Sequence, residues 1–532
     1  MFKIKRFYKP FILSLLLVLC LLGVQAVCDL SLPDLMSDIV NNGIQSKGVT
    51  NVAPEAISAN GLNFMTLFMS NEDKDFVIQN YTIISKGDTN YTSKYPLAET
   101  ENIYVLKDIS QDDMNKMDDI FGLTSDTALN VLQTVAQQKS EVGGQGSEGS
   151  SFDLTKMDTS NLDFSKIYAM GQMIPMMPPN TVTDAREKAA NTDPMMKTQI
   201  GKVFTIGFYT DLGMDVGKIQ SNYITSVGLK MIGITLLSAV AAISVGFLAS
   251  RMAAGVAKSL RKNIFEKVES FANEEFDKFS TASLITRSTN DITQIQQFTV
   301  MGTRMLLYSP ILGIGALIMM LNKGTTMAWT LALGIGAMIL LIAFAFKMVV
   351  PKIKIIQKLT DKINLVTKEN LTGIMVTRAF GTQKYEENRF NDVNLETTGV
   401  NRFVGRVMGF MMPAFMLIMN LLSLLIVWVG AHAIAQSNMQ VGDMMAFIQY
   451  AMQVIMAFLM IAMMFIVLPR ATVSAQRIDE VLKTPVKIKD PEDPRHFDES
   501  KTGYVEFKHV SFSYDGATEK VLDDIDFVAK PR

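Results

Sequence analysis

The sequence has little cysteine and little histidine. It contains two cysteines, Cys20 and Cys28, and three histidines, His432, His496 and His509. Two cysteines in or beside one apolar run are too few for a disulfide framework or a cysteine-based zinc site. The three histidines are too scattered along the chain to suggest a metal cluster. We therefore expect no metal bound by the side chains of this chain.

An excess of charge of one sign is also missing. Lys and Arg number 50 and Asp and Glu 52, so the formal net charge is −2. With so small a net charge, the protein has no overall electrostatic field that would attract nucleic acid or acidic substrates, and nucleic acid is not an expected partner. The composition is instead apolar, with 48% hydrophobic and 19% charged residues over 532 positions. This balance favours a membrane protein of more than one domain.

Long apolar runs recur along the chain, each close to the ~20 residues that a helix needs to cross a bilayer. They are Phe11–Val27, Ile224–Leu248, Met305–Leu321, Met327–Val350, Val407–Gly430 and Met444–Leu468. The first run continues in a helix-compatible pattern through Leu35, Ile39 and Val40. These runs predict about six membrane spans in total.

The N-terminus allows a second interpretation. Lys3, Lys5, Arg6 and Lys9 precede the first apolar run, which is the layout of a secretory signal. The stretch Val24–Ala26 is a weak cleavage site, and the apolar pattern runs on beyond it. A retained first span is favoured, and a cleaved signal is the alternative.

Basic residues gather at alternate ends of the predicted spans, as expected for cytoplasmic loops. They are Arg251, Lys258, Arg261, Lys262, Lys347, Lys352, Lys354, Lys358, Arg402, Arg406, Arg470 and Arg477. On the opposite side, Ala431–Asp443 has no Lys or Arg, and the turn after the third span has only Lys323. The pattern predicts a multi-pass protein of the cell membrane with both termini cytoplasmic and residues about 48–208 extracytoplasmic. A bacterial source is expected.

The segment between the first two spans has low apolar content and predicts a small α+β domain. Phe76–Lys86 and Asn102–Lys107 read as strands, and Asp112–Lys139 reads as a helix that Ser110 would cap. Val142–Ser151 has the composition of a flexible linker. A spacer or lid and a ligand-recognition domain both remain open. The segment shows neither a catalytic triad nor metal-ligand spacing, which disfavours an enzymatic role.

Two segments between spans are too long for turns. Arg251–Arg304 and Val349–Arg406 both carry apolar positions at helical spacing among charges. They predict spans that extend well into the cytoplasm and turn around at a short helix. Such extensions offer a surface for a cytosolic domain.

Both extensions contain sequence motifs of a known family. The first has Phe276–Ser280 followed by Ser283–Asp291, which reads SLITRSTND, and the second has Glu369–Phe380, which reads ENLTGIMVTRAF. These stretches resemble the two intracellular loops of ABC exporters. In the first loop, Ala282 and Ser283 stand where the family usually has Gly-Glu. The second loop follows the family pattern closely.

The C-terminal part extends the resemblance. Ser474–Leu482 is similar to the family's connector to its nucleotide-binding domain, and Val505–Tyr514 with Val521–Phe527 is similar to the first strands of that domain. The resemblance implies that Tyr514 stacks on adenine. A strand residue without a ligand is the alternative for Tyr514.

The phosphate-binding loop Gly-x-x-x-x-Gly-Lys-Ser/Thr occurs nowhere in the sequence. That loop supplies the backbone N–H groups and the lysine that hold phosphates, so this chain alone cannot hydrolyse ATP. We expect a domain that is cut off before this loop. The complete protein would use ATP with Mg²⁺.

The resemblance implies a fold class. It is a mainly α membrane protein with a six-helix ABC exporter transmembrane domain, long cytoplasmic helix extensions, an α+β extracytoplasmic insert and the first β-strands of a nucleotide-binding domain. The expected divisions are 1–47 with the first span, 48–208 for the insert, 209–484 for spans two to six, and 485–532 for the linker and the start of the nucleotide-binding domain.

The family also implies a partner and a coupling surface. Two such subunits, identical or different, would close their cassettes on ATP and thereby open the other side of the membrane. Short helices in the two loops would contact the cassettes without taking part in catalysis. Their residues are Ser280, Ser283, Leu284, Arg287, Asp291, Leu371, Thr372, Gly373, Ile374 and Val376.

A substrate would lie between the spans. Amide side chains within a span tend to face other helices or a cavity, and methionine adapts to varied apolar shapes. The candidate cavity residues are Asn420, Met445, Gln449, Gln453 and Met456, and a kink is expected at Pro413. Ordinary helix packing is the alternative for each of them. The set favours an amphipathic or apolar substrate, a drug, lipid or peptide. The fifth and sixth spans have no charged residue at their middle, which counts against a proton or ion relay.

Two other classes of protein share parts of this layout. A sensor can have two spans around an outside domain, and a channel or secondary transporter has several spans. Neither class explains the motif in the second loop. A regulatory or sensory membrane subunit that detects a ligand through the insert remains the alternative function.

Overall fold

The computed structural model describes residues 6–142, 180–323, 327–486, 503–513 and 518–530, with positions 167, 168, 171, 174, 178, 488 and 493. It divides into two units. Unit 1 consists of Met1–Gly23, Ala241–Ser309 and Met460–Arg532, and unit 2 of Val24–Val240 and Pro310–Leu459.

Long helices dominate both units. Among the described residues, six helical stretches are long and apolar enough to cross a membrane. They are Lys9–Gln45, Val216–Glu269, Thr281–Lys323, Ala328–Thr372, Gln383–Ala435 and Val441–Lys483. Each covers one of the apolar runs, although the fourth begins at Ala328, one residue after the predicted start at Met327, so the expected number of spans is confirmed. A helix suits this environment because it satisfies its backbone hydrogen bonds internally where lipid offers no partner.

The first stretch is one continuous helical segment. A 3₁₀ turn at Lys9–Phe11 leads into α1, Ile12–Asp38, which continues as a π-helical segment over Ile39–Gln45. The helix therefore runs past Val40, as the apolar pattern predicted.

The other spans belong to five long helices and continue beyond the apolar runs. They are α9 (Val216–Glu269), α12 (Asn290–Lys323), α13 (Ala328–Thr372), α15 (Gln383–Ala435) and α16 (Val441–Lys483). In α15 the helix continues through Pro413, and a kink there stays a prediction.

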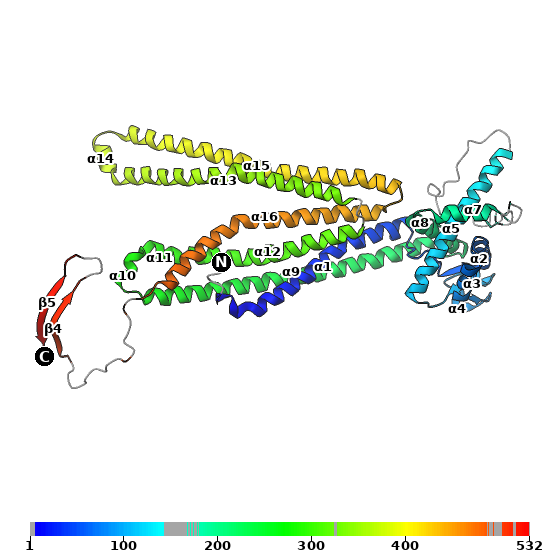
Figure 1. Ribbon diagram of the computed structural model, residues 1–532, viewed down its shortest axis with the longest axis horizontal. Helices are drawn as coiled ribbons and strands as arrows, with labels where there is room; N and C mark the ends of the chain where they lie inside the picture. The colour runs from blue at the N-terminus through cyan, green and yellow to red at the C-terminus, as the bar shows by residue number, and fades with distance from the viewer. Residues whose placement is uncertain are drawn as a thin grey trace. The chain divides into compact units, whose positions relative to one another are not determined.

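Short helices stand where the long helices turn around. Between α9 and α12 lie α10, Asn273–Lys278, and α11, Thr281–Ser288. Between α13 and α15 lies α14, Ile374–Ala379. Figure 1 shows α13 and α15 side by side with α14 at their turn. The prediction of helical extensions that turn at a short helix is thereby confirmed.

The insert contains a three-stranded antiparallel sheet in the order β1–β3–β2. Its strands are β1 (Ala56–Ser58), β2 (Tyr81–Ile84) and β3 (Ile103–Leu106). Residue Ile57 pairs with Tyr104, and Ile83 pairs with the same Tyr104 from the other side. The sheet confirms the α+β class of this segment.

Helices surround that sheet. They are α2 (Ala59–Thr66), α3 (Asn71–Asn80), α4 (Thr89–Thr92), a 3₁₀ turn (Pro96–Glu99), α5 (Gln111–Val142), α7 (Asn180–Ala190) and α8 (Pro194–Asp211). The predicted strand Phe76–Lys86 is wrong in its first half, because Phe76–Asn80 closes helix α3. Ser70 explains the difference, since its hydroxyl caps that helix by accepting from the Asp73 N–H. The β-rich residues begin only at Tyr81.

The predicted helix over Asp112–Lys139 is confirmed as α5. Ser110 Oγ accepts from the Asp113 backbone N–H at 3.1 Å, so the expected cap is also confirmed. Val142 is the last residue of α5, and the rest of the predicted linker, residues 143–151, lies outside the described residues.

One apolar core joins α5 and α8 of the insert to its sheet. Its fully buried side chains include Ile57, Met65, Phe121, Leu132 and Phe208. A core of this size gives the insert its own hydrophobic centre, as an independent domain requires.

The C-terminal segment of unit 1 forms an antiparallel pair of strands, β4 (Val505–Phe512) and β5 (Leu522–Ala529). Phe507 pairs with Phe527, and their rings stack with centroids 4.5 Å apart. The two β-rich runs predicted around Asp515–Gly516 are confirmed as strands. The turn itself, residues 514–517, lies outside the described residues.

Candidate functional site

The short helix α11 of the first loop is capped and anchored by residues that the sequence singled out. Ser280 Oγ accepts from the Ser283 N–H at 3.3 Å, which fixes the start of the helix. Leu284 is buried in an apolar cluster that includes Phe279, Ile292 and Ile478. One face of α11 is therefore packed inside unit 1, while the opposite face is exposed.

Two further residues of this loop bind the segment that follows the sixth span. Arg287 Nη1 donates to the Arg477 carbonyl at 3.0 Å and to Glu480 Oε2 at 2.8 Å. Asp291 Oδ1 accepts from Ser474 Oγ at 2.7 Å. The loop and the connector are separate motifs in the sequence, and the structure joins them directly. The stretch that leads toward β4 is thus fastened to the helix expected to contact a cassette.

The second loop differs from the prediction in its bounds. Leu371 and Thr372 are the last residues of α13, and the short helix α14 begins at Ile374. Gly373 lies between the two helices, and its N–H donates to the Glu369 carbonyl at 2.8 Å. This is the last helical bond of α13, and the backbone of Gly373 leaves the helical conformation at φ −90° and ψ 8°, so the short helix begins one residue later.

The tip of this second loop carries an apolar surface. Leu371, Met375, Val376 and Phe380 are 61–79% exposed, and all are large hydrophobic residues. Behind them, Arg389 Nη2 donates to Glu369 Oε2 at 2.6 Å and ties α15 to the end of α13. This ion pair between Arg389 and Glu369 stabilises the turn, and the apolar side chains at its tip stay exposed.

The residues predicted for a substrate cavity lie on α15 and α16. Asn420 and Met456 are exposed, and Met445, Gln449 and Gln453 are partly buried. Gln453 is bonded to the first span, because its Nε2 donates to the backbone carbonyl of Asp29 at 3.2 Å. The assignment of all five to one cavity stays a prediction.

Asp29 is a polar residue of the first span that the sequence reasoning missed. Ser238 Oγ of α9 donates to Asp29 Oδ1 at 2.6 Å, and Gln25 Nε2 lies 3.5 Å from Asp29 Oδ2. With Gln453 these residues join α1, α9 and α16 inside unit 2. One feature of the sequence could have pointed to Asp29. It is an acidic residue four positions after a glutamine within an apolar helix, and this spacing puts both side chains on one helix face.

An ionic network joins three helix ends in unit 2. Lys323 Nζ, at the end of α12, lies 2.6 Å from Asp34 Oδ1 of α1 and 3.0 Å from Asp443 Oδ1 of α16. Ser37 Oγ donates to Asp443 Oδ1 at 2.9 Å. The lysine of the turn after the third span therefore helps to hold three spans together.

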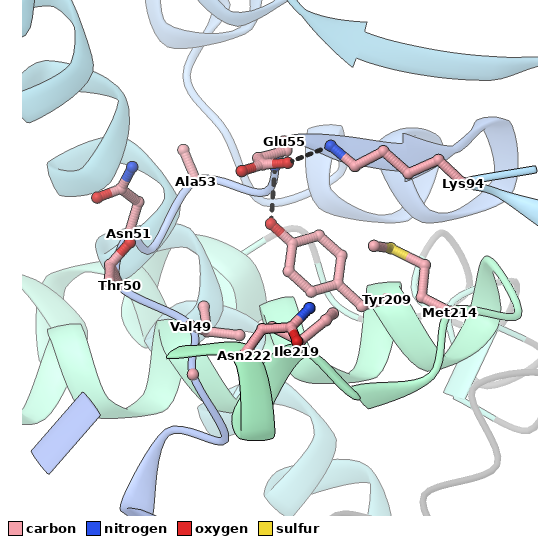
Figure 2. Close-up of a pocket in the computed structure, with 11 residues that line it drawn as sticks. Val49, Thr50, Asn51, Ala53, Glu55, Lys94, Tyr209, Met214, Ile219 and Asn222 are labelled. Atoms are coloured by element: carbon pink, nitrogen blue, oxygen red, sulfur yellow. Dashed lines mark hydrogen bonds and ion pairs between the residues drawn. The ribbon is translucent and has the colours of Figure 1, made fainter. Parts of the chain in front are cut away.

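A polar pocket of about 280 Å³ lies in unit 2 beside the insert's sheet. Figure 2 shows the ion pair between Lys94 Nζ and Glu55 Oε2, 2.8 Å long, above the ring of Tyr209. The Tyr209 hydroxyl accepts from the Glu55 N–H at 3.0 Å, and burial raises the pKa of this phenol, so it stays protonated. Ile219 and Asn222 line the pocket from the first turns of α9. A small polar ligand here would touch both the insert and the second span.

A buried lysine makes a second link between the insert and the first span. Lys202 Nζ of α8 donates to Asn42 Oδ1 at 2.7 Å, and burial lowers the pKa of its ammonium group. Gln220 Nε2 donates to the Gly43 carbonyl at 2.9 Å. The helical end of the first span is thus bonded to both α8 and α9.

Comparison with known proteins identifies the transmembrane part. Residues 194–458 match the ABC transporter transmembrane region. A Mycobacterium tuberculosis protein described as an uncharacterised ABC transporter ATP-binding protein is 34% identical over 316 residues, 59% of this chain and 54% of its own length. The chain belongs to the ABC transporter family.

Two other relatives of this ABC transporter have names that describe a substrate. A fatty acid ABC transporter ATP-binding/permease protein of Mycobacterium tuberculosis is 28% identical over 272 residues, 51% of this chain and 42% of its own length. A multidrug resistance ABC transporter ATP-binding and permease protein of Lactococcus lactis is 29% identical over 309 residues, 56% of this chain and 50% of its own length. The chain spans about half the length of the curated relatives it matches.

The match to the ABC transporter transmembrane region begins at residue 194, inside the predicted insert. Helix α8 therefore belongs to the matched region, while Phe204 and Phe208 on it are buried in the core of the insert. The first span and most of the insert precede the match. The boundary at 208 stays a prediction.

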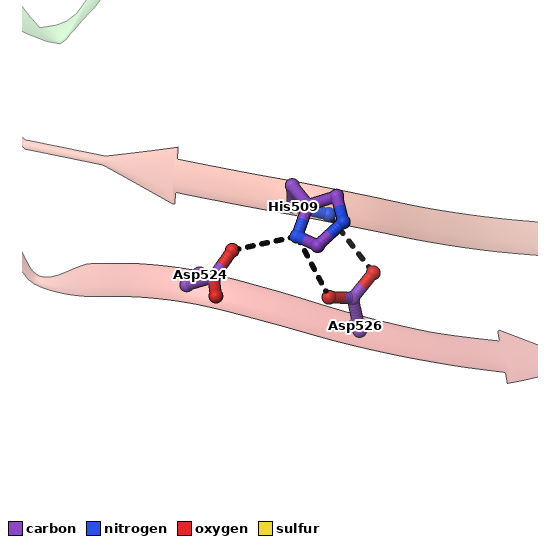
Figure 3. A group of neighbouring side chains, drawn as sticks. All are labelled: His509, Asp524 and Asp526. Carbon is purple, nitrogen blue, oxygen red and sulfur yellow. Dashed lines mark hydrogen bonds and ion pairs between the residues drawn. The ribbon is translucent and has the colours of Figure 1, made fainter.

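The start of the ABC transporter's expected nucleotide-binding domain shows one polar cluster. In Figure 3, His509 of β4 faces Asp524 and Asp526 of β5. Its Nδ1 lies 2.8 Å from Asp524 Oδ1 and 3.1 Å from Asp526 Oδ2. This histidine is isolated along the sequence, and only strand pairing brings the three together. All three side chains are at least half exposed, so hydrogen bonds between neighbouring strands on an exposed surface account for them. Tyr514, the predicted adenine-stacking residue, lies outside the described residues.

Proposed function

We propose that the chain is part of a subunit of an ATP-driven exporter that moves an amphipathic or apolar substrate, a drug, lipid or peptide, out across the cytoplasmic membrane. The match of residues 194–458 to the ABC transporter transmembrane region carries this proposal. The names of the relatives support the substrate class, because one is described as a fatty acid and another as a multidrug resistance transporter.

The complete protein would use ATP with Mg²⁺ and act with a second subunit, identical or different. The relatives' descriptions as ATP-binding proteins support the use of ATP. Tyr514 would stack on adenine there. ATP biases the transport cycle because it binds one arrangement of the cassettes better than the other.

The coupling surfaces would be α11 and α14. The bonds of Arg287 to the Arg477 carbonyl and Glu480 support this role, because they fasten α11 to the connector of the same subunit. The exposed apolar tip with Met375 and Phe380 supports it for α14, since such a patch favours contact with another protein surface. Both loops would then face the cytoplasm together with both termini, and the insert would lie outside.

An experiment on the complete subunit with its partner tests the proposal. Inverted membrane vesicles are given Mg²⁺ and ATP, and accumulation of a fluorescent fatty acid and of a lipophilic dye is followed. Uptake that requires ATP, and that is lost in Val376→Asp and Phe380→Asp but kept in the exposed control Lys362→Gln, is the expected result. The absence of ATP-dependent uptake, with ATP hydrolysis indifferent to every compound tried, would contradict an export function.

A sensory role of the insert is the second candidate. The pocket between Glu55, Lys94 and the first turns of α9 favours it, because a ligand there would touch the second span directly. Deleting residues 48–193 leaves the matched transmembrane region whole. If the insert senses a ligand, the deletion changes the response of ATP hydrolysis to added compounds. Identical responses of the two proteins to lipids, dyes and peptides would exclude recognition by the insert.

A further inference from the structure

The pocket beside the insert's sheet is built from two parts of unit 2. Glu55 comes directly before β1, and Lys94 lies between α4 and the 3₁₀ turn that follows it, so the insert supplies one wall. Val49 follows the first span, and Ile219 and Asn222 lie in the first turns of α9, so the spans supply the other. The volume of about 280 Å³ is close to the lower end of small-molecule pockets, which favours a ligand smaller than a drug.

One positive and one negative charge stand side by side in this pocket. Lys94 Nζ lies 2.8 Å from Glu55 Oε2, and the two side chains are 57% and 64% exposed, so both charged groups can also reach a ligand. An ion of a single charge would be attracted by one of them and repelled by the other. A ligand with both charges close together meets an opposite charge at each, and such charge-assisted hydrogen bonds are the strong ones.

The position of Glu55 is fixed through its backbone. Its N–H donates to the Tyr209 hydroxyl at 3.0 Å, and its carbonyl accepts from the Leu106 N–H of β3 at 2.9 Å. Because the Tyr209 hydroxyl accepts in the first of these bonds, its own hydrogen can be donated to an acceptor in the pocket. A carboxylate that pairs with Lys94 is such an acceptor.

Further polar side chains line the pocket and can bond either end of such a ligand. Thr50, Asn51 and Asn222 are exposed, and their side chains make no hydrogen bond within the part of the chain that the structure describes. Figure 2 shows Thr50 and Asn51 at one end of the pocket and Met214 at the other. Amide and hydroxyl groups both donate and accept, so they suit a ligand that carries an ammonium group and a carboxylate.

An apolar floor completes the pocket. It consists of Val49, which is buried, and of Met214 and Ile219, which pack in the same apolar cluster and are partly buried. A short apolar side chain placed on this floor would leave water, which favours binding. The pocket thus offers adjacent opposite charges for a head group and an apolar surface beside them.

We propose that this pocket binds a free α-amino acid with an apolar side chain. The proposal rests on the sensory role of the insert, the second candidate function, and names its ligand. The Glu55 carboxylate bonds the ammonium group, Lys94 and the Tyr209 hydroxyl bond the carboxylate, and the side chain lies on the apolar floor. An α-amino acid fits because it carries both charges on neighbouring groups of one carbon. No covalent step is involved.

The test measures binding to the whole chain in nanodiscs of phosphatidylcholine. Thermal unfolding is followed during titration with leucine, with leucinamide, which lacks the negative charge, with 4-methylpentanoate, which lacks the positive charge, and with glycine, which lacks the side chain. Leucine is expected to raise the unfolding temperature in a saturable way. Each of the other three is expected to need about tenfold higher concentration for the same effect.

Variants locate the effect. Glu55→Gln and Lys94→Gln each remove one charge and are expected to raise the half-saturating concentration of leucine about tenfold. In Lys94→Gln, leucine should lose its advantage over leucinamide, which a purely structural role of Lys94 would not explain. Asn222→Ala serves if neither charge variant folds, with an expected weakening of about fivefold. The control Lys362→Gln breaks an exposed ion pair with Glu396 outside the pocket and is expected to leave the titration unchanged.

Four results would overturn the proposal. They are no response to leucine, a response to leucinamide or 4-methylpentanoate equal to that to leucine, a response to glycine equal to that to leucine, and an unchanged leucine titration in both charge variants.

The outcome can be told apart from failure of the sensory role. Leucine that binds but leaves ATP hydrolysis by the complete subunit unchanged would contradict the sensory role and keep the amino-acid site. A response to other compounds that is lost on deleting the insert, with no binding of leucine, would contradict this site and keep the sensory role.

Discussion

The ammonium nitrogen of Lys323 lies 2.6 Å from Asp34 Oδ1, joining two helices that are far apart along the chain. The same nitrogen lies 3.0 Å from Asp443 Oδ1, so one lysine is shared by two carboxylates. Lys323 is 24% exposed, Asp443 17% and Asp34 50%, which makes the network partly buried. A network of this kind holds the ends of α1, α12 and α16 together in unit 2.

Replacing this lysine is expected to destabilise unit 2. Lys323→Gln leaves the carboxylates of Asp34 and Asp443 close together without the cation between them, and we expect a loss of about 1–3 kcal/mol. The matched control is Lys362→Gln, whose pair with Glu396 is 3.9 Å long and exposed on both sides. Thermal unfolding of the two variants in nanodiscs measures the difference. Equal unfolding temperatures would show that the network contributes nothing to stability.

The hydrogen bonds between Arg287 and the connector predict that a substitution of Arg287 makes the connector less protected against amide hydrogen exchange. Arg287→Ala removes hydrogen bonds to the Arg477 carbonyl and to Glu480, and amide hydrogen exchange over 474–483 is expected to accelerate about tenfold. Arg402→Ala, at an exposed position on α15, is the control and should leave that segment unchanged. Exchange rates measured by mass spectrometry provide the comparison. Unchanged protection in Arg287→Ala would mean that packing around Leu284 alone holds the connector.

A carboxylate inside the insert predicts a pH dependence of stability. Burial raises the pKa of Asp126 above its usual range, and its Oδ2 is buried without a hydrogen-bond partner in the described chain. A raised folded-state pKa means that the folded protein holds this proton more tightly than the unfolded chain. The group therefore favours folding most at acidic pH, below its unfolded pKa, and this contribution is lost as pH rises through the folded pKa.

Asp126→Asn should remove that contribution. The amide carries no charge at any pH, so the variant is expected to be more stable than the native protein at pH 7 and to depend less on pH between about 4 and 7. Asp113→Asn, at an exposed position early in the same helix, is the matched control. Unfolding temperatures recorded from about pH 4 to about pH 8 provide the measurement. An identical slope in the native protein and in Asp126→Asn would assign the pH dependence to other groups.

Gly201 predicts a steric effect on α8. A Cβ atom at this position would collide with Val52 Cγ1 and would lie 3.3 Å from the Gly122 backbone. Val52 cannot move easily, because Asp118 accepts its N–H at 2.8 Å and Thr205 donates to its carbonyl. Gly201→Ala is therefore expected to destabilise the insert by about 1–3 kcal/mol.

The control for this change is Gly233→Ala on α9, where an added Cβ meets nothing within 4 Å. Alanine in the middle of a helix is favoured over glycine, so a gain of about 0.5–1 kcal/mol is expected there. Thermal unfolding measures both variants. If the close contact between Gly201 and Val52 is real, the unfolding temperature falls in Gly201→Ala and rises in Gly233→Ala. A higher unfolding temperature in both variants would contradict close packing between α8 and Val52.

The fold was predictable wherever a local sequence pattern specifies the helix or strand. The apolar runs and their spacing predicted the six spans, and helical periodicity predicted their extensions and the turns at α11 and α14. Errors arose where a cap or a single glycine decides the boundary. Ser70 made Phe76–Asn80 helical, and Gly373 moved the second short helix to begin at Ile374.

The candidate site was predictable only in part, because sequence motifs give residues and not their partners. Gln453 was named from its spacing on α16, yet its bond to the Asp29 carbonyl joins positions 424 residues apart. Likewise, Arg287 and Glu480 each belonged to a recognised motif, and their contact depends on how α11 packs against α16.

Local hydropathy, charge and motif order were enough to predict the membrane class, the number of spans and the family resemblance. Helix packing, in contrast, determines which polar groups meet. It brought Lys323 between Asp34 and Asp443, and it left the amide oxygens of Gln25 and Gln453 near Asp29 without donors in the described chain. A polar side chain within a span must find its partners on other helices, and no local pattern specifies which helices those are.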